Sequence, residues 1–162
     1  MCIRDRFFAG LVSFPMIGAS TKPLAHAIYA DFQHKIETND LLLADFPEVC
    51  WPVRALEGTP QRAKRQHVNG NLTGLIWPAT KILRMPDVEG SPYGGFLMSY
   101  FGLDSAFRGV NVRSRRPDFI LIDDPETRES AKSYDQGVDR EQIIDRDVAG
   151  LASQEDLSLI HI

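Results

Sequence analysis

Cysteine is scarce in this chain of 162 residues, which contains only Cys2 and Cys50. Cys2 lies in a terminal segment that we assign below to a sequencing adapter. The single remaining cysteine cannot form an internal disulfide framework, so the composition is typical of a reducing compartment. Cys50 has no catalytic partner near it in the sequence, and we predict that it is a small buried residue.

Long hydrophobic runs are also missing. No stretch of about 18 apolar residues occurs, so no membrane-spanning helix is predicted. The formal net charge is −4, and this acidity argues against a protein that binds nucleic acid over its whole surface, but not against a local basic patch. One candidate basic patch consists of Arg62, Lys64 and Arg65, and its alternative interpretation is a solvated loop face. A second candidate patch consists of Arg108, Arg113, Arg115 and Arg116.

Two kinds of ligand-binding motif are absent as well. The string Gly-x-x-x-x-Gly-Lys-Ser/Thr, whose backbone cradles nucleotide phosphates, occurs nowhere in the sequence. The histidines His26, His34 and His67 show no metal-ligand spacing with other ligands. His26 and His34 fall on a predicted helix, where we expect them to pack or to face solvent.

The two ends of the chain are compatible with one DNA sequence read in opposite orientations. ATG TGT ATA AGA GAC AG and one further base encode Met1–Arg6, and the reverse complement, CTG TCT CTT ATA CAC AT followed by C, encodes Leu157–Ile162. That DNA sequence resembles the transposase end used to prepare sequencing libraries. We therefore predict that residues 1–6 and 157–162 are adapter-derived and exclude them from the predicted fold, with residues 7–156 an internal piece of a longer protein.

The order of the apolar segments predicts an α/β fold. Residues 7–19 and 96–101 are predicted to be buried strands. The continuously apolar run 119–122 predicts a strand that is buried on both faces, as in a parallel sheet. Helical segments are predicted between and after these strands, so we expect a mostly parallel sheet flanked by helices.

Helical spacing is clearest directly after the first strand. Ser20 or Thr21 can cap this helix and Pro23 suits its first turn. Residues 41–58 predict short helical turns that Pro52 interrupts, and residues 130–152 predict a loop leading into a helix. Residues 72–77 and 81–85 predict a small antiparallel hairpin. The apolar face of the first helix is predicted to consist of Leu24, Ala27, Ile28, Phe32 and Ile36.

The most informative stretch is Arg116-Pro-Asp-Phe-Ile-Leu-Ile-Asp-Asp-Pro-Glu126, in which the apolar strand runs directly into Asp123 and Asp124. Ligands of parallel sheets bind beyond the carboxyl ends of the strands, and carboxylate oxygens suit Mg²⁺. The pattern is the physical form of a Walker B motif. It predicts Asp123 as the metal residue and Asp124 as the group that orients or deprotonates an attacking water.

Two alternatives remain open for this acidic segment. Many enzymes of this kind carry Glu at the second position, and Asp is shorter by one methylene, so Glu126 is an alternative general base, although Pro125 turns the chain between it and Asp124. The other alternative is that Asp123-Asp124-Pro125 is only a turn, since Asp and Pro are common turn formers.

Three blocks of the sequence resemble the large terminase subunits of tailed bacteriophages. They are Leu42–Glu57, Arg108-Gly109 and Arg116–Ala131. The resemblance covers most of residues 7–156 in order and with loose spacing. Proteins of this family are motors that thread viral DNA into an empty capsid, and they join an N-terminal P-loop ATPase domain to a C-terminal nuclease domain with an RNase-H-like fold.

The resemblance implies a P-loop NTPase-type sheet that lacks its first strand and its P-loop. It implies that Asp123 and Asp124 are the Walker B residues, and that ATP and Mg²⁺ are cofactors of the full-length parent. It also implies a role for Arg108 at the nucleotide of a neighbouring subunit, where a guanidinium would neutralise charge on the transferred phosphoryl group. A loop salt bridge is the alternative for Arg108, and Arg113 is a competitor for its role.

The partners that the resemblance implies are double-stranded viral DNA, the portal protein, the small terminase subunit and further copies of the chain in a ring, without a membrane. The expected location is the bacterial host cytoplasm and, transiently, the viral procapsid. Because the phosphate cradle is missing, we expect the isolated chain to bind ATP poorly and not to hydrolyse it. The alternatives are another P-loop NTPase, such as a helicase-like enzyme, and a non-enzymatic α/β binding domain.

Overall fold

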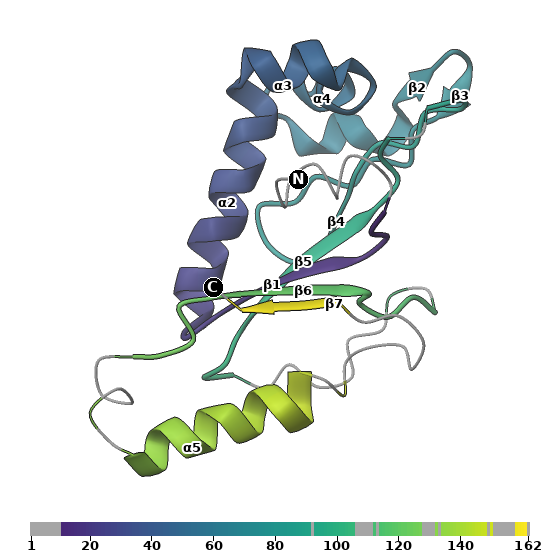
Figure 1. Ribbon diagram of the computed structural model, residues 1–162. Helices are drawn as coiled ribbons and strands as arrows, with labels where there is room; N and C mark the ends of the chain where they lie inside the picture. Colours follow the sequence, from purple (N-terminus) through teal and green to yellow (C-terminus); the bar gives the residue numbers. More distant parts are fainter. Residues whose placement is uncertain are drawn as a thin grey trace. The chain divides into compact units, whose positions relative to one another are not determined.

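The computed structural model describes residues 11–91, 93–105, 112, 114–127, 132, 134–148, 150 and 158–161 (Figure 1). The contacts between residues divide the chain into two compact units. The first unit consists of Met1–Ser13 and Ala30–Met98, and the second of Phe14–Tyr29 and Ser99–Ile162.

The second unit is built on parallel strands. Strand β1 (Pro15–Ala19) pairs in parallel with β5 (Leu97–Gly102) on one side and with β6 (Phe119–Asp123) on the other. Strand β7 (Ser158–His161) extends the parallel arrangement beyond β6. In the first unit, β4 (Leu83–Arg84) pairs antiparallel with the first two residues of β5, and the full strand order is β4-β5-β1-β6-β7.

The strands form where the sequence is continuously apolar. All five residues of β1 are buried, and in β6 the side chains of Phe119, Ile120 and Ile122 are buried. Strands covered on both faces need such runs because neither face meets water. The predicted α/β class, with a mostly parallel sheet flanked by helices, is therefore confirmed, as are the strands predicted at residues 96–101 and 119–122. The strand predicted at residues 7–19 is present only at Pro15–Ala19, because residues 11–14 are not in a strand and residues 7–10 lie outside the described residues.

Helix α2 (Lys22–Thr38) follows β1, as the sequence predicted. Its start is held by two side-chain oxygens, because Thr21 Oγ1 accepts a hydrogen bond from the Leu24 amide at 3.4 Å and Asp104 Oδ1 accepts one from the Lys22 amide at 3.0 Å. These bonds satisfy amide groups that no helical carbonyl can reach.

The predicted apolar face of α2 was partly wrong. Leu24 and Ala27 are exposed, and the buried positions of the helix are Ala25, Tyr29, Phe32, Gln33 and Ile36. The buried face of the first turns differs from the predicted one because Tyr29 is buried there. Its ring packs on Tyr100 of β5, with ring centroids 4.9 Å apart. Burial raises the pKa of the Tyr29 hydroxyl far above its ordinary value.

The helices of the first unit that follow α2 are short. Asn39 caps α3 (Asp40–Asp45) by accepting hydrogen bonds from the Leu41 and Leu42 amides. Helix α4 (Pro47–Arg54) contains Pro52 within it, so the prediction that Pro52 interrupts the helical segment was wrong. A 3₁₀ helix, η1 (Pro60–Arg65), follows.

The small antiparallel hairpin exists, but at another place. It is formed by β2 (His67–Val68) and β3 (Asn71–Leu72), whereas the sequence predicted it between residues 72–77 and 81–85. Of that predicted pairing, one bridge is present, between Ile76 and Arg84. The two-residue turn at Asn69-Gly70, with φ of 52° and 84°, explains the shift, because paired residues of positive φ match the twist of a tight hairpin.

Helix α5 (Tyr134–Ile143) and the π-helical turn η3 (Ile144–Val148) belong to the second unit. This agrees with the helix predicted within residues 130–152. The predicted adapter segment at residues 157–162 was excluded from the fold, yet Ser158–His161 pair with β6 as β7. The pairing leaves the origin of that segment untested, and residues 1–6 lie outside the described residues.

Candidate functional site

Three strands of the second unit end at the same level. In the pairing register, Ala19 of β1 lies beside both Gly102 of β5 and Asp123 of β6. The connection after β5 returns to β1, where the Leu103 amide donates a hydrogen bond to the Ala19 carbonyl at 2.9 Å. This shared carboxyl edge is the part of a parallel sheet at which ligands bind.

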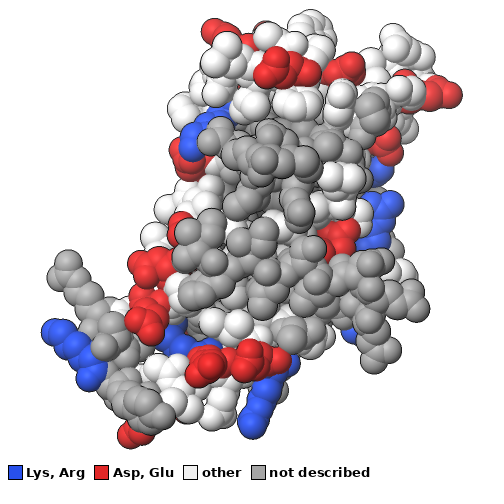
Figure 2. Space-filling model, in the orientation of Figure 1, with Lys and Arg blue, Asp and Glu red and all other residues white. Residues whose placement is uncertain are grey.

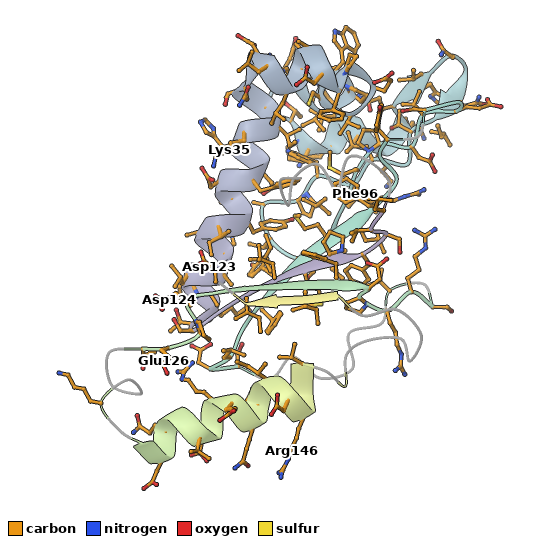
Figure 3. All side chains as sticks on the ribbon, viewed as in Figure 1. Lys35, Phe96, Asp123, Asp124, Glu126 and Arg146 are labelled. Carbon is orange, nitrogen blue, oxygen red and sulfur yellow. The ribbon has the colours of Figure 1, made fainter. Side chains whose placement is uncertain are left out.

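Asp123 and Asp124 lie at this edge (Figure 3). Asp123 is the last residue of β6 and is half-buried, whereas Asp124 is exposed and has a left-handed backbone with φ of 46°. The Asp124 carbonyl accepts a hydrogen bond from the Ser20 amide, at 3.0 Å, so the turn is tied to the end of β1. Asp is one of the few residues other than Gly that adopt this conformation at modest cost.

Glu126, the alternative general base, is exposed on the segment that leaves β6 after Pro125. Figure 3 shows Asp123, Asp124 and Glu126 following one another along this segment. Within the described part of the chain, no three His, Cys, Asp or Glu side chains are grouped so that they could hold a metal ion. A preformed metal cage is therefore not seen, but Mg²⁺ in nucleotide sites is commonly held by one or two carboxylates together with the phosphates.

The amino end of α2 does not offer a phosphate cradle. It lies at the same edge as Asp123, where helix N-termini of nucleotide-binding sheets bind phosphates. Here the Lys22 amide is already bonded to the carboxylate of Asp104. A carboxylate in that position repels an anion, and this agrees with the absence of a P-loop string from the sequence.

The predicted arginine site cannot be placed, because Arg108 and its competitor Arg113 lie outside the described residues. Arg62 of the first candidate basic patch pairs with Glu57, and Lys64 and Arg65 are exposed. Figure 2 shows acidic side chains gathered over the region of α5 and the end of β6, while basic ones are scattered over this view. Among the side chains coloured in this view, the basic ones form no broad patch.

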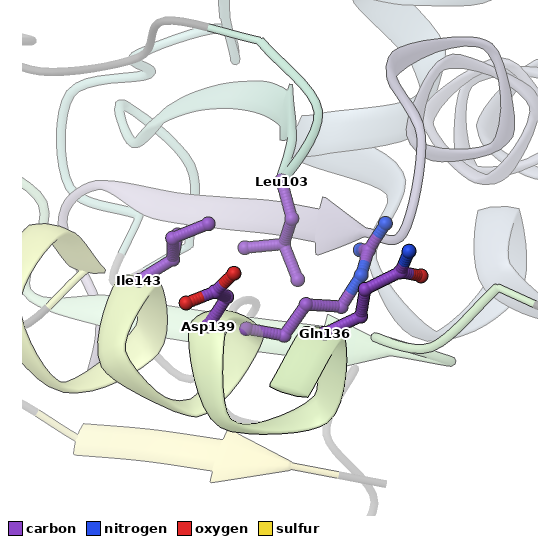
Figure 4. A pocket seen from close by; sticks show the side chains of 5 residues that line it. Leu103, Gln136, Asp139 and Ile143 are labelled. Atoms are coloured by element: carbon purple, nitrogen blue, oxygen red, sulfur yellow. The ribbon is translucent and has the colours of Figure 1, made fainter. Parts of the chain in front are cut away.

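Arg140 of α5 is a member of this site that the sequence did not reveal. Its Nη1 donates hydrogen bonds to the Pro125 carbonyl at 2.7 Å and to the Ser20 carbonyl at 3.3 Å. Beside it lies a pocket of about 190 Å³ (Figure 4), lined by Leu103, Gln136, Asp139, Arg140 and Ile143. A lone arginine on a polar helix carries no sequence signal of such contacts.

A second hollow, of about 210 Å³, lies in the first unit and is lined in part by Gln33, Glu37 and Trp77. The polar groups of these residues are bonded internally, because Gln33 donates to the Pro78 carbonyl and the Trp77 indole donates to Glu37. Cys50 is buried in the same unit, as predicted, and burial raises the pKa of its thiol to about 11. The raised pKa disfavours the reactive thiolate form of Cys50.

Comparison of the chain with protein-family models, with curated proteins and with solved structures gives no significant match. Among the helices that the structure describes, none has the length and apolar character that crossing a membrane requires. A functional assignment therefore rests on the carboxyl edge of the sheet and on the residues gathered there.

Proposed function

We propose that this chain is part of the ATP-hydrolysing motor domain of a phage DNA-packaging terminase large subunit. The observation that carries the proposal is Asp123, which ends the parallel strand β6 at the carboxyl edge and is followed directly by Asp124. Two further observations support the same conclusion. Strand β6 follows β1 and β5 in the chain, and the segments Leu42–Glu57 and Arg116–Ala131 resemble terminases.

In this proposal the P-loop NTPase-type sheet is incomplete, and the P-loop comes from the longer parent protein. Asp123 would hold Mg²⁺, which draws charge from the transferred phosphoryl group. Asp124 would orient the attacking water and accept its proton, with Glu126 as the alternative acceptor. Arg108 would act on the nucleotide of a neighbouring copy in the ring, and the partners would be viral DNA, the portal protein and the small terminase subunit.

The left-handed turn at Asp124 favours a second candidate, a non-enzymatic α/β binding domain in which Asp123-Asp124-Pro125 is only a turn. The Asp124 carbonyl is used structurally, because it binds the Ser20 amide. The two readings differ in what they require of the side chain: the turn needs a residue that tolerates positive φ, and hydrolysis needs a carboxylate.

The test therefore changes the carboxylate while keeping the turn. In a parent protein that includes the P-loop, Asp124→Asn and Asp124→Gly are both expected to fold, because Asn and Gly accept the left-handed conformation. Loss of the general base should lower kcat by roughly 10²–10⁴-fold, measured as phosphate release from MgATP.

Asp135→Asn is the matched control, because Asp135 is an exposed carboxylate in the first turn of α5. It should leave kcat unchanged. If both Asp124 variants and Asp123→Asn keep full ATPase activity, the acidic segment is a turn and the proposed function is wrong.

A further inference from the structure

Three hydrogen bonds to backbone carbonyls form a network around the acidic turn. The Ser20 amide donates to the Asp124 carbonyl, and Arg140 Nη1 donates both to the Ser20 carbonyl and to the Pro125 carbonyl. Both peptide groups of Ser20 that face this edge are therefore occupied. Residues from β1, from the segment after β6 and from α5 meet in one network.

Arg140 is placed to decide the conformation of this turn. It donates to the carbonyl of Pro125, which follows Asp124 in the chain, and to the carbonyl of Ser20, whose amide is bonded to Asp124. Bonds from a charged donor are about twice as strong as neutral ones. The residue between them, Asp124, holds a left-handed φ of 46°. Aspartate adopts this conformation at modest cost, and the contacts around it help to keep the turn in place.

Only one nitrogen of the guanidinium takes part in the bonds to the Ser20 and Pro125 carbonyls. The guanidinium carries five N–H groups on three nitrogens, and among the described residues its hydrogen bonds are made through Nη1. Arg140 is half-buried and borders the pocket lined by Leu103 and Ile143. A lysine also has a nitrogen that can donate to both carbonyls, but its ammonium is strongly hydrated and its stem is flexible, so it should hold the two carbonyls less firmly.

We propose that Arg140 is a positioning residue for the acidic turn: by binding the Pro125 and Ser20 carbonyls, it fixes the direction in which Asp123 and Asp124 present their carboxylates. The catalytic consequence rests on the proposed function. The clamp itself is a property of this chain and can be measured without any activity.

The first measurement is amide hydrogen exchange on the chain itself, comparing Arg140→Met with the unchanged protein. Methionine keeps most of the length and removes the donors. The Ser20 amide, which is bonded to Asp124, should exchange at least about tenfold faster, because the turn opens locally. The ladder amides between β1 and β5 should keep their exchange rates.

Arg146→Met is the matched control, because Arg146 is an exposed arginine on η3, close to Arg140 in the sequence (Figure 3). It should change none of these rates. Arg140→Lys provides a second, milder variant and should recover part of the Ser20 protection. An unchanged Ser20 rate in Arg140→Met overturns the proposal, as does an equal acceleration of all amides in the second unit.

The second measurement uses the P-loop-containing parent. Arg140→Met should lower kcat by roughly ten- to a hundredfold with little change in the KM for MgATP, because misplaced groups slow chemistry more than binding. The double variant with Asp124→Asn should lose little more than Asp124→Asn alone, since both changes act through the same carboxylate. Additive losses would overturn the positioning role.

The two proposals fail in different ways. If ATPase activity is insensitive to Asp123→Asn, the proposed function is wrong, while the exchange of the Ser20 amide still decides whether Arg140 holds the turn. If activity depends on Asp123 but Arg140→Met leaves kcat and Ser20 exchange unchanged, only the role of Arg140 is wrong.

Discussion

Replacing Gly102 by alanine is expected to open the carboxyl edge of the sheet and to lower the melting temperature by roughly 6–12 °C. Gly102 is the last residue of β5, beside Ala19. A Cβ atom there would lie 2.6 Å from the Lys22 Cα and even closer to the Lys22 nitrogen and Asp104 Oδ1. Because the obstacle is mostly backbone, a rotamer change cannot relieve it, and the cost should be about 3 kcal/mol, at the upper end of overpacking.

Gly137→Ala is the control for this prediction. Gly137 lies inside α5, and a Cβ atom at that position meets nothing within 4 Å. Alanine should therefore stabilise the chain by roughly 0.5–1 kcal/mol, because it has the higher helix propensity. Thermal unfolding followed by circular dichroism gives both values. A Gly102→Ala variant that melts like the unchanged protein would mean that the first turn of α2 does not press against β5.

The strands of this fold could be predicted because their signal is local. The run Phe119–Ile122 is apolar at every position, and a buried parallel strand is the simplest structure that hides all of it. Because Asp123 and Asp124 directly follow this run in the sequence, they could be predicted to lie at the end of the strand. Both predictions can be made without knowing which strands are neighbours in the sheet.

The face of α2 could be predicted only in part, because periodicity does not say which of two adjacent stripes faces the sheet. Leu24 fits the apolar stripe by spacing but is exposed, while Tyr29, which was not part of the predicted face, is buried against Tyr100. The long body of a tyrosine is apolar, and packing on a neighbouring ring decided its place.

The tertiary partners of the site could not be predicted from the sequence. Arg140 lies 120 residues from Ser20, and Asp104 lies 82 residues from the Lys22 amide that it caps. Such contacts depend on how helices and loops return to the sheet. Side chains that bind backbone carbonyls or amides at long range leave no motif, and this is why the acidic pair was found and the residues around it were not.

Gly94→Ala is expected to have an effect on the first unit as large as Gly102→Ala has on the second. Gly94 lies in the loop between β4 and β5, next to the bond that the Gly95 amide donates to the Pro86 carbonyl at 2.9 Å. It has φ of 101°, and a Cβ atom there would overlap the Pro86 carbonyl oxygen. Overpacking of roughly 1–3 kcal/mol adds to backbone strain of similar size.

Gly90→Ala separates the cost of backbone strain from the cost of overpacking, because Gly90 lies in the same loop as Gly94. Gly90 has φ of 83°, but a Cβ atom there meets nothing within 4 Å, so only the left-handed backbone opposes alanine. It should cost roughly 1–2 kcal/mol. Gly94→Ala should cost clearly more, and hydrogen exchange should show lost protection of the Met85 amide, which bonds the Phe96 carbonyl across the loop. Equal losses of stability in the two variants would show that the Pro86 carbonyl can move aside. The loop would then adjust its conformation while the β4–β5 pairing stays intact.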